Sequence, residues 1–107
     1  RQMPQDLDYT DDLGIRLGHR WSPLESVGLY VPGGLASYPS SVLMNAIPAI
    51  ASGVSRLVMV VPSPEGKLNP ALLAAAHVAG ITEIYKIGGA QAVAAIAYGT
   101  QSITPVD

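Results

Sequence analysis

Residues 56–61 read RLVMVV, an apolar run that follows a single arginine. A run of this length without alternation is typical of a central parallel strand, because both faces of such a strand are covered. Gly53 stands just before the run, and a Pro-Ser-Pro loop signal follows it at residues 62–64. The stretch therefore predicts a buried strand in the middle of an α/β sheet.

The segment before this run predicts one strand and one helix. Residues 27–31 form a short, largely apolar stretch that ends at a proline and two glycines, so we expect a strand there. Apolar side chains then recur at helical spacing over residues 42–50. We expect Ser40 and Ser41 to cap the start of this helix and Pro48 to kink it.

The segment after the run repeats the same order of elements. Asn69 and Pro70 stand in the favoured order for a helix start, a cap followed by a proline. Residues 81–87 then predict another strand, and residues 90–98 predict an alanine-rich helix that ends at Gly99. Alternating strands and helices with short loops predict a parallel sheet with right-handed crossovers.

The expected fold class is therefore α/β, a three-layer Rossmann-like open parallel sheet. We expect it to be incomplete, because a full doubly wound domain carries about five or six strands and this chain predicts fewer. Residues 27–107 are expected to form this partial core, truncated at its C-terminal side. Residues 1–26 are expected to form an N-terminal extension, with an irregular lead-in over 1–12. Alternating apolar residues over 13–21 predict a half-buried strand or hairpin arm.

Composition argues against several classes of partner. The formal net charge of −2 provides no concentrated basic face for nucleic acid or an anionic membrane. The chain has no cysteine, which excludes disulfides, thiolate zinc sites and a cysteine nucleophile within it. Its best apolar stretch, residues 42–54, is too short and too interrupted for a membrane span. Because no signal peptide is visible either, we expect a cytoplasmic protein.

Two glycine turns are the candidate ligand-binding elements. Pro32-Gly33-Gly34 and Gly88-Gly89-Ala90-Gln91 each stand between a predicted strand and a predicted helix. Ligands of open α/β sheets bind at this edge, where helix N-termini favour phosphate. Neither turn fits the Gly-x-Gly-x-x-Gly pattern or has an acidic residue about twenty positions on. On spacing alone, ordinary tight turns explain them equally well.

Tyr30 and Gln91 are the candidate binding residues at these turns. Tyr30 ends its predicted strand, where its ring could flank a nucleotide, although a core aromatic is the commoner role. Gln91 stands in the first turn of its predicted helix, where an amide serves either as a cap or as a ligand contact. His19 and His77 have no carboxylate or second histidine at ligand spacing, so we predict no catalytic or metal-binding residue in this chain.

Four stretches resemble the histidinol dehydrogenase family. They cover Val27–Gly34, Pro39–Pro48, Asn69–Ala76 and Ile84–Thr100, in unbroken order and at family spacing. The resemblance runs from about Leu13 to the end of the chain. It implies a zinc- and NAD-dependent oxidoreductase of histidine biosynthesis that oxidises L-histidinol, through the aldehyde, to L-histidine with two NAD.

The resemblance also implies roles for individual residues. A tyrosine and a glutamine that match Tyr30 and Gln91 contact NAD in the family. The family's later Gly-Pro-Gly-Asn stretch, its catalytic Glu-His pair and its Gln, His and Asp zinc ligands match nothing in this chain. A partner subunit completes the family's site in a homodimer. We therefore expect the chain to be a catalytically inactive part of the enzyme that positions NAD.

Two alternatives remain open at this point. One is a related zinc- and NAD-dependent dehydrogenase of the same superfamily that acts on another small alcohol, such as a sulfonated diol. The other is a non-catalytic α/β module for ligand binding or oligomerisation. The sequence encoded after Asp107 would discriminate between the module and the dehydrogenase, whereas a substrate screen would separate the two enzymes.

Overall fold

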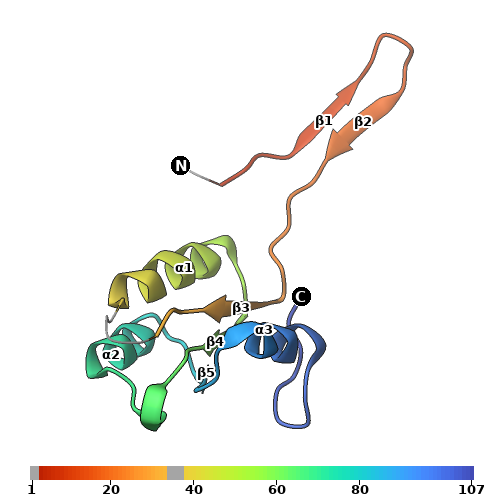
Figure 1. Cartoon of the computed structure of the whole chain (residues 1–107). Coiled ribbons are helices and arrows are strands. Elements are labelled where there is room, and N and C mark those ends of the chain that lie inside the picture. Colours follow the sequence, from red (N-terminus) through yellow and green to blue (C-terminus); the bar gives the residue numbers. More distant parts are fainter. Residues whose placement is uncertain (1–2, 34–37) are drawn as a thin grey trace.

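A three-stranded parallel sheet forms the centre of the computed structural model, which describes residues 3–33 and 38–107. Its strands are β3 (Ser26–Tyr30), β4 (Arg56–Val60) and β5 (Glu83–Tyr85), in the order β3-β4-β5 (Figure 1). The run that predicted a central strand is thus β4, which pairs with a parallel neighbour on each side. The predicted α/β class with an incomplete parallel sheet is confirmed.

Three helices cover the two faces of the sheet. Alternate residues of β4 point to opposite faces, as the pleat of a strand requires. Met59 packs into the cluster that contains buried residues of α1 (Pro39–Ser52) and α2 (Pro70–Val78). Val58 packs on the other side, in the cluster that contains α3 (Gly89–Tyr98). The molecule therefore has the three layers that the sequence predicts.

The helix ends confirm one predicted cap and correct another. The Asn69 side chain accepts a hydrogen bond from the Ala71 amide at 2.8 Å, so the predicted cap of α2 is confirmed. The predicted serine caps of α1 are wrong, because α1 already begins at Pro39 and both serines lie within its first turn. Proline favours the first helical position, since its fixed φ suits the helix and its missing donor is not needed there. The helix continues through Pro48 to Ser52 and is capped by Gly53, where φ is 98°.

A β-hairpin precedes the sheet. Strand β1 (Leu7–Thr10) pairs antiparallel with β2 (Arg16–His19). The irregular lead-in predicted for residues 1–12 is therefore wrong for β1, and residues 1–2 lie outside the described part. The Asp11 carboxylate stabilises the turn by accepting 2.9 Å hydrogen bonds from the amides of Leu13 and Ile15.

The hairpin projects away from the sheet as an arm (Figure 1). The Cα radius of gyration is 17.7 Å, against about 13 Å expected for a compact domain of this length. All residues of both strands are exposed, so the predicted half-buried strand is wrong in its burial. By register, Leu7, Tyr9 and Leu17 share one face, whereas Asp8 and Arg16 pair on the other. The arm thus presents an apolar face with no partner among the described residues.

The remaining predicted strand and the last segment complete the core. Strand β5 covers only Glu83–Tyr85 of the strand predicted over 81–87, although Ile81 is buried against α2 and its neighbours. After α3, Ile103 is buried on the α3 face, and the Val106 amide donates to the Ile96 carbonyl at 2.9 Å. Within residues 3–33 and 38–107, no helix is long and apolar enough to cross a membrane.

Candidate functional site

The turns that follow the three parallel strands meet at one edge of the sheet. Parallel strands end at the same edge, and ligands of open α/β sheets bind in the crevice there. The turns are Pro32-Gly33 after β3, Pro62-Ser63 after β4 and Gly88-Gly89 after β5. The remaining glycine of the first motif, Gly34, lies outside the described residues.

Pro62 lies between the two glycine turns. A Cβ atom on Gly33 would collide with the Pro62 carbonyl oxygen, and one on Gly88 would lie 2.8 Å from Pro62 Cβ. Gly88 has an extended backbone with φ of −147°, which any residue can adopt, so crowding is what requires glycine there. The sequence indicated the two glycine turns as candidate ligand-binding elements; in the structure, the absence of a side chain at both glycines leaves room for Pro62.

Tyr30 ends β3 at this edge. Its residue is 39% exposed, so it is not the buried core aromatic that was the commoner expectation. Its hydroxyl oxygen accepts a hydrogen bond from the Gly89 amide at 3.0 Å. Gly89 is the first residue of α3, and its amide is one of the donors that no carbonyl within the helix can satisfy. The Tyr30 hydroxyl therefore accepts from a helix N-terminal amide that could also donate to a phosphate oxygen.

The Gln91 side chain also lies close to Gly89. Gly89 has a φ of +76°, and a Cβ atom there would lie 2.5 Å from Gln91 Oε1. The Gln91 side chain is thus folded over Gly89 in the first turn of α3. The structure brings the two predicted residues, Tyr30 and Gln91, together at one glycine. An amide and a phenol beside a helix N-terminus can together hydrogen-bond an anionic ligand such as a dinucleotide.

One cation at this edge was missed from the sequence. Lys86 follows β5 directly, and its ammonium donates to the Gly66 carbonyl at 3.0 Å. Gly66 ends the short 3-10 helix η1 (Pro64–Gly66) in the loop after β4, so Lys86 ties this loop to the end of β5. Its place just before the second glycine turn could have indicated it.

The two histidines lie away from this edge. His19 is at the end of β2, where its ring stacks edge-on against Trp21 at a centroid distance of 5.8 Å. His77 is on α2 and is exposed. Across the described ranges, no three His, Cys, Asp or Glu side chains gather as a metal site would need.

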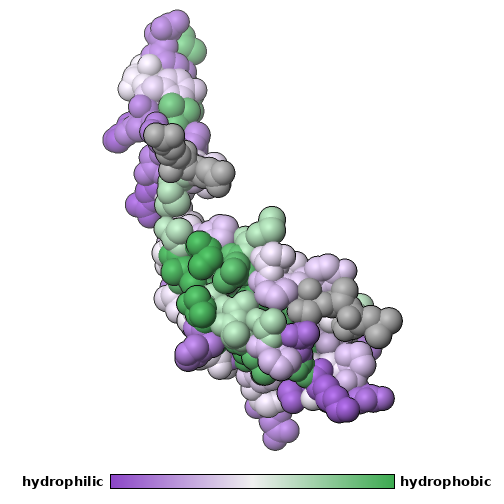
Figure 2. All heavy atoms as spheres, turned by 90° about the vertical axis from the view of Figure 1, so that its left-hand side faces the viewer, coloured by the Kyte–Doolittle hydropathy of each residue, from purple (hydrophilic) through white to green (hydrophobic). Residues whose placement is uncertain are grey.

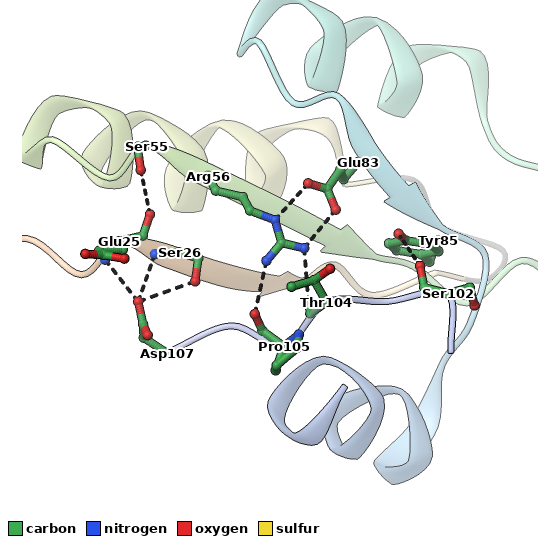
Figure 3. A network of polar contacts seen from close by, with 10 residues as sticks. All are labelled: Glu25, Ser26, Ser55, Arg56, Glu83, Tyr85, Ser102, Thr104, Pro105 and Asp107. Atoms are coloured by element: carbon green, nitrogen blue, oxygen red, sulfur yellow. Dashed lines mark hydrogen bonds and ion pairs between the residues drawn. The ribbon is translucent and has the colours of Figure 1, made fainter. Parts of the chain in front are cut away.

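A polar network lies at the opposite edge, where the strands begin (Figure 3). Arg56 forms two hydrogen bonds to the Glu83 carboxylate, at 2.8 and 2.9 Å, and donates to the carbonyls of Thr104 and Pro105. The guanidinium lowers the pKa of Glu83, and the carboxylate raises the pKa of Arg56. The network holds the last segment of the chain against the sheet, so its role is structural.

Known proteins match the whole of this chain. The sequence model of a family described as "Histidinol dehydrogenase" matches residues 1–107. The chain is 67% identical over 107 residues to "Histidinol dehydrogenase 1" of Trichormus variabilis, covering 100% of this chain and 25% of the relative. It is 71% identical over 106 residues to "Histidinol dehydrogenase" of Rhodopseudomonas palustris, covering 99% of this chain and 25% of that relative.

A solved structure has the same fold. The crystal structure of histidinol dehydrogenase from Elizabethkingia anophelis matches with a TM-score of 0.85 and 37% sequence identity. The match covers 99% of this chain and 25% of that one. The chain thus spans about a quarter of the length of the proteins that it matches.

Proposed function

Because this chain belongs to the histidinol dehydrogenase family, we propose that it is the NAD-positioning part of an NAD-dependent histidinol dehydrogenase. The proposal rests on one observation: the Tyr30 hydroxyl and the Gln91 side chain both lie against Gly89. Both side chains lie at the carboxyl edge of a parallel sheet, where a dinucleotide binds in folds of this class. The N-terminus of α3 offers amide donors and a positive dipole end to a phosphate.

The proposed reaction is the oxidation of L-histidinol to L-histidine in histidine biosynthesis. A base takes the hydroxyl proton while a hydride leaves the carbinol carbon for the nicotinamide ring, which gives the aldehyde. Water then adds to the aldehyde, and the hydrate would lose a hydride to a second NAD and two protons, one of them to a base, to give the carboxylate. In this proposal, Tyr30 and Gln91 hold each NAD in turn at the same edge.

The remaining groups of the reaction lie outside this chain in the proposal. Zinc, when bound, orients the substrate and polarises its hydroxyl, and its ligands belong to the rest of the protein. The acid and base also belong there, and a second subunit of a homodimer completes the site. Residues 27–107 then form a partial nucleotide-binding core, and residues 1–26 form an extension from it.

The test is an assay of the full-length protein with L-histidinol and NAD. We expect two NADH for each histidinol consumed, and we expect a zinc chelator to abolish the activity. The chain of residues 1–107 assayed alone should give no turnover, since it lacks the acid, the base and the metal. A full-length protein that oxidises a different small alcohol, or none, would contradict the proposal.

A further inference from the structure

The loop that follows β4 has a strained backbone at the carboxyl edge of the sheet. This loop covers residues 62–67, and its Gly66 and Lys67 amides donate to carbonyls within it, at 2.9 and 3.2 Å. Glu65 has a φ of 57° and is the only non-glycine residue with a positive φ in the described part of the chain. A side chain disfavours this left-handed conformation, because its Cβ comes close to the following carbonyl oxygen. Such a conformation persists only where surrounding groups hold it in place.

Lys86, which directly follows β5, holds this loop from outside. Its ammonium donates to the carbonyl of Gly66, the residue next to Glu65, at 3.0 Å. Across residues 3–33 and 38–107, no other element sends a side-chain hydrogen bond to the backbone of this loop. Lys86 has no carboxylate partner among the same residues, so the loop carbonyl is the acceptor of its charge-assisted bond. The bond is therefore the main polar support of the loop.

A second contact joins the same two segments. Pro62 begins the loop, and a Cβ atom on Gly88 would lie 2.8 Å from Pro62 Cβ, so these two residues pack closely. Gly66 follows Pro62 within the loop, and Lys86 precedes Gly88 in the segment after β5. The two segments are thus connected at two points, Pro62 to Gly88 and Gly66 to Lys86. Two contacts fix the orientation of one segment relative to the other, whereas the Pro62 contact alone would let the loop pivot.

Pro62 connects this loop to both turns of the candidate site. Its carbonyl oxygen lies where a Cβ atom on Gly33 would be, in the turn that follows Tyr30. Its ring packs against the turn that leads into Gly89, the residue that donates to the Tyr30 hydroxyl. Gln91 lies against the same Gly89. A loop that pivots at Pro62 would therefore displace both turns on which the two candidate side chains depend.

We propose that Lys86 is a positioning residue of the NAD site. Its bond to Gly66 holds the loop after β4, and the loop holds Pro62 between the turns of Tyr30 and Gln91. Lys86 thus acts through the loop and not through contact with the dinucleotide. A ligand binds less tightly in proportion as the binding-competent arrangement is less populated, so loss of this support weakens NAD binding. The effect on NAD rests on the proposed function, whereas the support of the loop does not.

Hydrogen exchange of the Gly66 amide, measured in the full-length protein without NAD, tests the support of the loop. This amide donates within the loop, so it exchanges when the loop opens. Lys86→Met removes the ammonium, retains an unbranched stem, and should speed the exchange about fivefold. Lys86→Arg retains a charged donor and should stay within about twofold of the wild type. Lys67→Met, the matched control, removes an exposed cation of the same loop and should also stay within about twofold. Equal exchange in Lys86→Met and the wild type would overturn the proposal.

The KM for NAD and the kcat of the same variants test the link from the loop to the site. Lys86→Met should raise the KM about two- to fivefold, with kcat within about twofold of the wild type. Lys86→Arg should restore most of the wild-type KM, and Lys67→Met should leave the KM unchanged. Faster exchange at Gly66 with an unchanged KM in Lys86→Met would overturn the positioning role. A wild-type protein that does not use NAD would instead contradict the proposed function, and the exchange measurement would not depend on it.

Discussion

The hydroxyl oxygen of Tyr30 accepts a hydrogen bond from the backbone amide of Gly89 at a distance of 3.0 Å. The two residues are 59 positions apart in the sequence, one at the end of β3 and the other at the start of α3. This bond joins the two turns that the sequence singled out. Gln91 lies over the same glycine. Both side chains that we propose to contact NAD therefore lie against Gly89.

Replacing Tyr30 by phenylalanine tests the hydroxyl separately from the ring. The substitution removes one neutral hydrogen bond, which contributes about 0.5–1.5 kcal/mol, and retains the aromatic surface. We expect the KM for NAD of the full-length enzyme to rise about three- to tenfold, with little change in kcat. Tyr98→Phe, at an exposed tyrosine near the other end of α3, is the control. Unchanged KM in Tyr30→Phe would contradict a role for the hydroxyl.

Gly88 and Gly33 lie against different atoms of Pro62. A substitution of Pro62 should therefore restore stability to only one of the two corresponding glycine variants. Gly88→Ala places its Cβ against the Pro62 ring, whereas Gly33→Ala places its Cβ against the Pro62 carbonyl oxygen. Each should lower the free energy of unfolding by about 1–3 kcal/mol, measured by urea denaturation of the full-length protein. Adding Pro62→Gly removes the ring but retains the carbonyl. It should therefore rescue Gly88→Ala and not Gly33→Ala.

A double-mutant cycle measures this difference. Pro62→Gly alone serves as the reference, because it has its own cost in the entropy of the unfolded chain. We expect a favourable coupling of about 1 kcal/mol or more between Gly88→Ala and Pro62→Gly, and a coupling near zero for the Gly33 pair. Equal coupling for both pairs would show that the two glycines do not meet different atoms of Pro62.

The Arg56–Glu83 pair predicts a dependence of stability on pH. Arg56 lowers the pKa of Glu83 below its ordinary value of 4.5. The stabilisation by this pair is therefore present above the ordinary pKa and is lost as the pH falls through the lowered pKa of folded Glu83. Glu83→Gln should make the unfolding midpoint less sensitive to acid between about pH 6 and about pH 3.

The matched control for this pH effect is the exposed pair in the arm. Arg16 lowers the pKa of Asp8 in the same direction, but both side chains are more than half exposed. Water and salt screen such surface pairs, so Asp8→Asn should change the pH profile less than Glu83→Gln does. A larger change in Asp8→Asn would contradict the structural role assigned to the network around Arg56.

Exposed apolar surface predicts that residues 1–107 alone self-associate. Figure 2 shows hydrophobic atoms gathered on the core near the base of the arm. A groove of about 550 Å³ between α1 and the segments that flank the arm has Trp21 and Leu24 in its lining. Met44 and Ile47 of α1 are 75% and 49% exposed. Patches of this kind normally bind another protein surface. Sedimentation velocity should show species larger than a monomer.

Two substitutions locate the surface responsible for this association. Met44→Lys places a charge on the apolar face of α1 and should shift the sedimentation profile toward the monomer. Val78→Lys, at a residue that is 79% exposed at the end of α2, should leave the profile nearly unchanged. A wild-type chain that sediments as a clean monomer, with no binding of an apolar dye, would contradict the prediction.

The sequence predicts those elements whose local signals agree with their packing. The apolar run of β4 is buried on both faces, and its composition alone carries that information. The Asn69-Pro70 start of α2 is fixed by short-range hydrogen bonding, so it too is predictable. Strand β1 was missed because the four aspartates of residues 6–12 suggested a solvated segment, although Leu7 and Tyr9 alternate with polar neighbours. Pairing with β2 decides its structure.

The sequence predicts which residues belong to the candidate site, but it does not predict how they are arranged. The motif positions of Tyr30 and Gln91 pointed to them, but nothing in the sequence shows that both meet at Gly89. That meeting depends on the packing of α3 against β3 across the sheet. The contact of Gly33 and Gly88 with Pro62 likewise depends on the register of three strands. Such relationships arise from tertiary packing, which local patterns do not encode.

The most direct measurement is a crystal structure of the full-length protein with bound NAD. We predict that the dinucleotide lies at the carboxyl edge of the sheet, within hydrogen-bond distance of both the Tyr30 hydroxyl and the Gln91 amide. A dinucleotide bound elsewhere, or one that contacts only one of these two side chains, would contradict it.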